Sequence, residues 1–165
     1  WTTLRHGGRA SMRRYWDDPE TRGLLKDDLA WEIQQSMSIT AGDTSNANRI
    51  RQAWDRELDR LFSQYDFLVW PTAQLFPYDK NTPWPTQISG RSMDTYHRWM
   101  EVVMYASLGG LPTVNVPVGF DAQGRPMGMQ IMGRYGEDKK VLEFALAYEN
   151  ITDFLDARPN LVAAS

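Results

Sequence analysis

Apolar residues recur every three or four positions through most of the first sixty residues, which is the spacing of helices with one buried face. Pro19 is placed to start a helix, because the missing N–H of proline costs nothing at the first helical position. An interval of four then separates Leu25, Leu29, Ile33 and Met37. The pattern predicts helices whose apolar stripe faces a core.

A longer helix is predicted to begin at Thr40. Thr40 and Asp43 have the spacing of a capping box, in which each side chain bonds the backbone N–H of the other residue. Apolar residues continue after this start at helical spacing: Ala47, Ile50, Trp54, Leu58, Leu61 and Phe62. The charged residues between them are interpreted as the solvated face of the helix.

The spacing of the apolar residues changes at Tyr65. Residues 67–70 form a short continuous apolar run that ends at Pro71, the pattern of a strand buried on both faces and therefore central in its sheet. The segment from Thr72 to Arg91 is too rich in proline for regular structure and too aromatic for a simple solvated linker. It predicts a loop that packs against another part of the molecule.

The remainder alternates helices and strands. Residues 94–107 are predicted to form a helix that Gly109 and Gly110 stop, with Val103 and Ala106 on its apolar face. Residues 113–118 and 127–132 are β-type runs joined by a turn at 121–124, which predicts a hairpin. A last helix at 138–149 is expected to turn four side chains inward: Val141, Leu142, Ala145 and Tyr148.

These elements make an α/β fold with an incomplete sheet. Three strands with exposed edges invite pairing with further strands, so we expect them to belong to a larger sheet. The chain also begins at Trp1 with no initiating methionine, which we interpret as the start of a piece of something longer.

Composition narrows the function classes. The 165 residues are 42% hydrophobic and 24% charged with a net charge of −3, so we expect a soluble cytoplasmic protein that binds neither nucleic acid nor membrane. Cysteine is absent, and His6 and His97 lack the spacing of a zinc site, so neither a metal nor a cofactor is expected. A pocket role for His97 and a core or surface role both stay open.

Candidate nucleophiles lack the local architecture that acyl transfer needs. No serine lies in a Gly-x-Ser-x-Gly turn, and no lysine stands in an apolar context that would lower its pKa. Seven tryptophans and the loop from Trp70 to Trp84 instead suggest an apolar pocket, although Trp31 and Trp54 are better interpreted as core. We therefore expect no catalytic residue in this chain.

Two segments resemble the amidase signature family. Residues 65–72, YDFLVWPT, are similar to its "YD-x-L-x-x-PT" strand, and residues 109–133 are similar to its "GLP-x-x-x-VP-x-GF…G-x-P-x-G-x-Q-x-x-G" segment. The resemblance covers about residues 46–149. It implies the C-terminal part of the amidase signature fold, a large mixed sheet flanked by helices.

The resemblance also implies a division of labour. Residues 1–165 would be the C-terminal segment of a single amidase domain, mainly helical over 1–64, with strands, a pocket loop and helices over 65–149 and a tail over 150–165. Members of the family use a serine nucleophile, a second serine and a lysine base, all in their N-terminal half. The resemblance therefore implies that the N-terminal catalytic part of the same amidase is the partner of this segment, with an amide as the small-molecule substrate.

In this family the loop after the "PT" strand and the helix before "GLP" help to form the substrate pocket. Carried over to this sequence, the resemblance implies that the substrate-binding residues are Thr72, Gln74, Phe76, Tyr96, Trp99, Met100 and Met104. Their aromatic and thioether side chains suit an apolar acyl group.

Three functions compete. The first is the substrate wall of an amidase that converts a carboxamide to a carboxylate and ammonia. The second is the amidase-type subunit of a tRNA-dependent amidotransferase, in which the resemblance implies an acidic residue where this chain has Met100, with Glu101 one position away. The third is a binding or structural module without catalysis. The oligomeric state stays open, a homodimer included.

Overall fold

A computed structural model describes residues 1–157 of the chain. Its backbone contacts divide into two compact units, Trp1–Asp59 and Arg60–Ser165. Half of the predicted tail at 150–165, namely residues 158–165, lies outside the described residues. No helix among the described residues is long and apolar enough to span a bilayer.

Short helices make up most of the first unit. They are α1 (Thr2–Gly7), η1 (Ala10–Met12), α2 (Arg13–Asp17), α3 (Pro19–Arg22) and α4 (Asp27–Ser36). Pro19 begins α3 as predicted, with the Asp18 carboxylate accepting a hydrogen bond from the Glu20 N–H at 3.0 Å.

The predicted apolar stripe is only partly buried. Ile33 on α4 is fully buried, whereas Leu25 lies before the helix begins and Met37 is exposed just after its end. The correction has a local cause, since α4 spans only ten residues and covers too few turns to carry the whole stripe inward.

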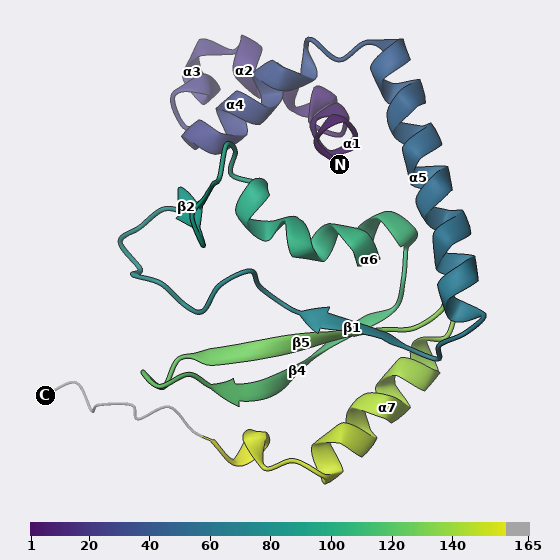
Figure 1. The fold of residues 1–165 in the computed structure, drawn as a ribbon. Coiled ribbons are helices and arrows are strands. Elements are labelled where there is room, and N and C mark those ends of the chain that lie inside the picture. Colours follow the sequence, from purple (N-terminus) through teal and green to yellow (C-terminus); the bar gives the residue numbers. More distant parts are fainter. Residues whose placement is uncertain (158–165) are drawn as a thin grey trace, which may run out of the picture. The chain divides into compact units, whose positions relative to one another are not determined.

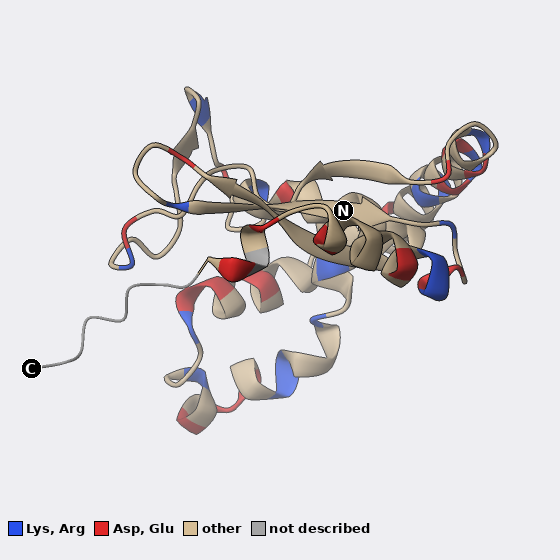
Figure 2. Ribbon diagram, turned by 90° about the horizontal axis from the view of Figure 1, so that it is seen from below, with Lys and Arg blue, Asp and Glu red and all other residues tan. Residues whose placement is uncertain are grey.

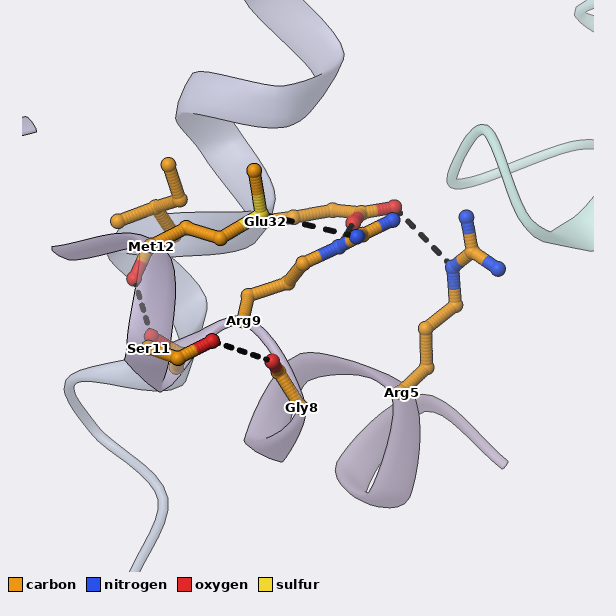
Figure 3. Close-up of polar contacts among 8 residues, drawn as sticks. Arg5, Gly8, Arg9, Ser11, Met12 and Glu32 are labelled. Atoms are coloured by element: carbon orange, nitrogen blue, oxygen red, sulfur yellow. Dashed lines mark hydrogen bonds and ion pairs between the residues drawn. The ribbon is translucent and has the colours of Figure 1, made fainter. Parts of the chain in front are cut away.

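A buried carboxylate organises this unit. Glu32 on α4 has a side chain that is only 3% exposed, and it receives the Nε of Arg5 at 3.1 Å and the Nε of Arg9. Figure 3 shows the two arginines reaching the carboxylate from the N-terminal segment. The two arginines together compensate the negative charge of this one buried carboxylate.

Helix α5 (Ala41–Phe62) begins with the predicted capping box. The Asp43 carboxylate accepts the Thr40 N–H at 3.0 Å, and the Thr40 hydroxyl accepts the Asp43 N–H at 3.1 Å. The hydrogen bond from the Thr40 hydroxyl, followed by the one from its N–H, lowers the pKa of Asp43. Leu58 is buried, but Ile50 is exposed, so the apolar face of α5 is covered only toward its C-terminal end.

The second unit contains a three-stranded antiparallel sheet in the order β1–β5–β4 (Figure 1). Its strands are β1 (Leu68–Pro71), β4 (Thr113–Phe120) and β5 (Pro126–Met132). None of the three contains a charged residue, and Figure 2 accordingly shows them uncoloured by charge. The predicted hairpin of β4 and β5 is confirmed, with Val114 opposite Ile131 and an irregularity between Pro117 and Gly119.

Helices cover both faces of this sheet. On one face α6 (Met104–Gly109) brings Tyr105 to Trp70, with ring centroids 5.3 Å apart. On the other face α7 (Asp138–Asn150) brings Phe144 to Phe67 at 4.5 Å. Figure 1 shows α6 and α7 on opposite sides of the strands. The core on the α7 side centres on Val116, Ile131 and Ala145.

Strand β1 differs from its prediction. It pairs only with β5 and so is an edge strand among the described residues, and Val69 is 48% exposed. An unbroken apolar run indicates which residues could be buried, but the strands and helices that pack beside the run determine which of them are buried. Here the central position belongs to β5, which pairs on both sides.

Three other expectations need correction. The predicted helix at 94–107 is instead a turn followed by η2 (Arg98–Val103) and α6, because Met100 has a non-helical backbone. The loop at 72–91 enters a small hairpin of β2 (Gln87–Ile88) and β3 (Arg91–Ser92). Its two-residue turn places Ser89 and Gly90 at positive φ, the geometry that tight hairpins prefer. On α7, Leu142 is 63% exposed although it was expected inside.

The last described element is η3 (Phe154–Asp156), which contacts β4. Gly119 lies directly under it, at φ +113, and a Cβ there would approach the Phe154 ring to 3.3 Å. The end of the described chain therefore closes back over the hairpin.

Truncation of the core side chain Ile131 tests this arrangement. Ile131→Ala removes a fully buried side chain, so we expect it to lower the free energy of unfolding by about 2–5 kcal/mol. Leu142→Ala, at an exposed position of α7, should change it by less than about 0.5 kcal/mol. Urea unfolding followed by circular dichroism measures both, and equal losses would contradict the assignment of the core.

Candidate functional site

A cavity of about 200 Å³ opens where β1 ends and β5 begins. Its walls come from the segment after β1, from η2 and from the first residues of β5. The lining residues are Thr72, Ala73, Leu75, Phe76, Pro77, Tyr78, Trp99, Pro126, Met127 and Gly128. None of these carries a charge, so the described lining suits an apolar group.

A contact across β5 fixes the sheet side of the cavity. Thr72 continues the ladder beyond Pro71 by donating its N–H to the Gly128 carbonyl at 2.9 Å. The Thr72 hydroxyl then bonds the side-chain oxygen of Asn115, a residue of β4. Because β5 lies between β1 and β4, these two side chains meet over it, at Gly128.

Gly128 is required for this contact. A Cβ on Gly128 would collide with Oδ1 of Asn115 and would lie 2.9 Å from Oγ1 of Thr72. No side chain can occupy that place unless the Thr72–Asn115 bond is displaced. The glycine is therefore explained by close approach of neighbouring side chains, not by its backbone angle.

Gln130 fixes the end of β1 from within the sheet. Its side chain is buried, and its Nε2 donates a hydrogen bond of 2.9 Å to the Pro71 carbonyl. Gly133 plays a comparable part beyond the strand, since a Cβ there would collide with Cγ2 of Val141 on α7. Gly128, Gln130 and Gly133 thus allow β1, β5 and α7 to pack closely together.

Aromatic rings form the opposite side of the cavity. Trp99 on η2 meets Tyr78 edge-on with centroids 6.0 Å apart and meets Tyr96 at 6.2 Å. Trp84 in turn packs against Tyr96 at 6.4 Å. Edge-to-face pairs of this kind hold their members in a preferred orientation, so Trp99 is a supported wall.

The structure brings together three of the seven residues expected at the substrate pocket. Thr72, Phe76 and Trp99 line the cavity, whereas Tyr96 contacts Trp99 but is not among the described lining residues. Gln74 turns away from it, because its Oε1 accepts the Val102 N–H at 3.1 Å.

Met100 and Met104 are not among the described lining residues. Sequence reasoning also missed the contribution of β5, namely Pro126, Met127 and Gly128. The motif that contains these residues was visible, but its position beside Thr72 depends on the pairing of β1 with β5, which joins residues about sixty positions apart.

Charges near η2 neutralise one another. Arg98 donates to Asp94 at 2.9 Å and to Glu101 at 2.8 Å. The hydrogen bond from Arg98 lowers the pKa of Asp94. Glu101 is thus held in an ion pair along its own helix.

Serine and lysine side chains show no nucleophile and base pair among the residues that the structure describes. Ser36, Ser63 and Ser107 each donate to a backbone carbonyl three or four residues earlier, as serines in helices commonly do. The hydrogen bond to Asp66 at 2.9 Å raises the pKa of Lys140. A general base needs the opposite shift, so the contact makes Lys140 unsuited to that role.

A second cavity, of about 280 Å³, is larger, but its lining is charged and contains the ion pairs of Lys140. It is lined by Phe62, Tyr65, Asp66, Arg134, Glu137 and Lys140. Lys140 bonds Asp66, and the Nη2 of Arg134 donates to the Phe62 carbonyl at 2.9 Å. Since these cations are engaged by protein oxygens, the smaller apolar cavity is the better candidate site.

Comparison with known proteins gives a consistent family. Residues 8–142 match the Amidase family. A glutamyl-tRNA(Gln) amidotransferase subunit from Synechococcus sp. (strain RCC307) is 34% identical over 113 residues, which cover 68% of this chain and 22% of the relative. An acylamidase of Rhodococcus erythropolis is 29% identical over 161 residues, which cover 96% of this chain and 33% of the relative.

Solved structures share the fold. A bacterial aryl acylamidase of the amidase signature family superposes with a TM-score of 0.74 at 25% identity, over 90% of this chain and 31% of that protein. A 6-aminohexanoate cyclic dimer hydrolase superposes with a TM-score of 0.68 at 19% identity, over 98% of this chain and 36% of that protein.

The chain spans only 22% and 33% of the length of the two relatives described above. Within that span, the family match covers the helical segment from η1 onward and the sheet with its cavity. The mixed α/β structure corresponds to about a third of each superposed enzyme. The chain belongs to the amidase family, whose members include the amidase signature enzymes that it resembles in fold.

Proposed function

We propose that this chain supplies the substrate wall of an amidase that hydrolyses a carboxamide to a carboxylate and ammonia. The observation that carries the proposal is the uncharged cavity between Thr72, Phe76 and Trp99. Burial of an aryl or alkyl group in such a cavity stabilises the complex by roughly 1.5–3 kcal/mol. The wall then determines which amide binds.

The chemistry itself is proposed to lie in an N-terminal part of the same amidase domain, outside residues 1–165. There a serine oxygen attacks the amide carbon, a lysine with a second serine carries the proton to the leaving nitrogen, and ammonia departs. Water then hydrolyses the acyl-serine to the carboxylate and restores the serine. In the described chain, the hydrogen bonds of Ser36, Ser63 and Ser107 to helix carbonyls support this division.

The sheet supports an association with further strands. Among the described residues β1 and β4 each pair on one edge only, with β5 between them. Unpaired edges favour addition of strands from the N-terminal part. The predicted 1–165 segment, helical over 1–64 and with the sheet and pocket loop over 65–149, is accordingly proposed to complete its domain with that part.

The relatives support two versions of the activity. One is named an acylamidase and one solved relative an aryl acylamidase, in line with an apolar substrate group. Others are named as subunits of a glutamyl-tRNA(Gln) amidotransferase, which supports a subunit of a tRNA-dependent amidotransferase as the second candidate. Two observations favour the first candidate. The lining of the cavity is apolar. In addition Glu101, the acidic residue nearest to Met100, where an acidic residue is expected in the amidotransferase subunit, is paired with Arg98. A non-catalytic binding or structural module, the third alternative, would leave amides unchanged even in the complete protein.

Residues 1–165 on their own should show no amidase activity, because the proposed nucleophile and base lie outside them. The purified chain is assayed for ammonia release from acetamide and benzamide, with the complete protein as the positive control. Turnover by the chain alone that a single serine-to-alanine change abolishes would overturn the proposed division of labour.

Replacement of Trp99 should change substrate preference. Trp99→Ala removes one wall of the cavity, so in the complete enzyme we expect KM for benzamide to rise roughly ten- to a hundredfold, with little change for acetamide. The kcat for acetamide should stay near that of the parent enzyme, because binding is lost far from the reacting atoms.

Trp84→Ala is the matched control, since Trp84 is a half-buried tryptophan that contacts Tyr96 and is not among the described lining residues. Melting temperatures are measured for both variants. An equal loss of activity on both amides that follows the fall in melting temperature would make Trp99 a structural residue and the pocket assignment wrong.

A further inference from the structure

Arg125 reaches from the hairpin turn to the wall of the cavity. It lies between β4 and β5, and its Nη1 donates a hydrogen bond of 3.1 Å to the carbonyl of Pro77, 48 positions earlier. Its guanidinium also stands over the ring of Phe76, 5.7 Å from the centroid. Phe76 and Pro77 both line the cavity, so one side chain holds two neighbouring residues of its wall.

The hairpin turn that carries Arg125 is itself held in place by Asp121. Oδ1 of Asp121 accepts the N–H groups of Gln123 and Arg125, each at 2.9 Å, which closes the turn. Oδ2 of Asp121 receives Nε of Arg125 at 2.7 Å and Nη2 at 2.6 Å. This two-point contact orients the plane of the guanidinium and leaves Nη1 directed at Pro77.

The wall needs such a support. Residues 72–86 form no helix and no strand, and they contain Pro77, Pro83 and Pro85, which cannot donate backbone hydrogen bonds. Gln74 ties the beginning of this segment to η2 through the Val102 N–H. Arg125 connects the next part of the segment to the hairpin turn through the Pro77 carbonyl.

We infer that Arg125 is a positioning residue for amide recognition, which fixes Phe76 and Pro77 and thereby sets the width of the cavity that receives the apolar group of the substrate. The inference rests on the proposed function of the cavity. It assigns Arg125 no contact with the reacting atoms. Its consequence is that substrate preference depends on a turn outside the cavity lining.

The support can be tested without any assay of activity. Lys80 is exposed three residues after Pro77, so trypsin cleavage after Lys80 reports opening of the segment. Loss of a charge-assisted hydrogen bond in Arg125→Ala should accelerate this cleavage roughly tenfold in the complete protein. Lys139→Ala is the control, because it breaks an exposed ion pair with Glu143 on α7, and its cleavage after Lys80 should match the parent.

The kinetic test separates positioning from stability. In Arg125→Ala the KM for benzamide should rise several-fold relative to that for acetamide, while kcat for acetamide stays near the parent value. Arg125→Lys should recover part of the preference, since an ammonium can still donate to the Pro77 carbonyl but cannot make the two-point contact with Asp121. Lys139→Ala should leave both KM values unchanged.

The outcomes distinguish this inference from the proposed function. Unchanged trypsin cleavage in Arg125→Ala, or faster cleavage with an unchanged benzamide-to-acetamide preference, would overturn the positioning role. Phe76→Ala serves as the reference. If Phe76→Ala shifts the preference and Arg125→Ala does not, only the role of Arg125 is wrong; if neither shifts it, the cavity is not the substrate site and the proposed function fails.

Discussion

Strand β5 pairs on both of its edges, and the placement of the cavity follows from that constraint. The strand carries Gly128 where Thr72 and Asn115 meet across it, and two residues later it carries Gln130, which bonds the Pro71 carbonyl. A larger residue at position 128 would separate the two side chains. The missing side chain of Gly128 therefore leaves room for the contact that fixes Thr72, the residue after β1 at which the cavity wall begins.

The same arrangement explains why the site suits apolar groups. The residues that line the cavity are all uncharged, and two arginines near it are engaged by carboxylates: Arg98 by Asp94 and Glu101, and Arg125 by Asp121. Lys140 forms an ion pair with Asp66, and Ser63 and Ser107 donate hydrogen bonds to backbone carbonyls of the preceding helical turn. These contacts support the proposal that this segment recognises the substrate, whereas acyl transfer takes place outside residues 1–165.

Much of the structure was predictable from the sequence wherever the determinants are local. The capping box of Thr40 and Asp43, the hairpin around the turn at 121–124 and the helix α7 each depend on residues a few positions apart, and all three are confirmed. The edge position of β1 among the described strands was not predictable, because it depends on which strands this segment contains to lie beside it. The lining was predictable only in part for the same reason: Phe76 and Trp99 have suitable side chains, but the approach of Met127 and Gly128 depends on long-range pairing.

The central claim, that Gly128 keeps open the place where Thr72 and Asn115 meet, is tested most directly by a double-mutant cycle of Gly128→Ala and Asn115→Ala. The free energy of unfolding is measured for the parent, both single variants and the double variant, with Gly7→Ala, where a Cβ would meet nothing within 4 Å, as the control for an added methyl group. We expect Gly128→Ala to cost about 1–3 kcal/mol. Asn115→Ala should recover part of this loss, with a coupling of about 1 kcal/mol, because it removes the oxygen that the new methyl group meets. Additive effects, or a Gly128→Ala variant as stable as the parent, would contradict the account.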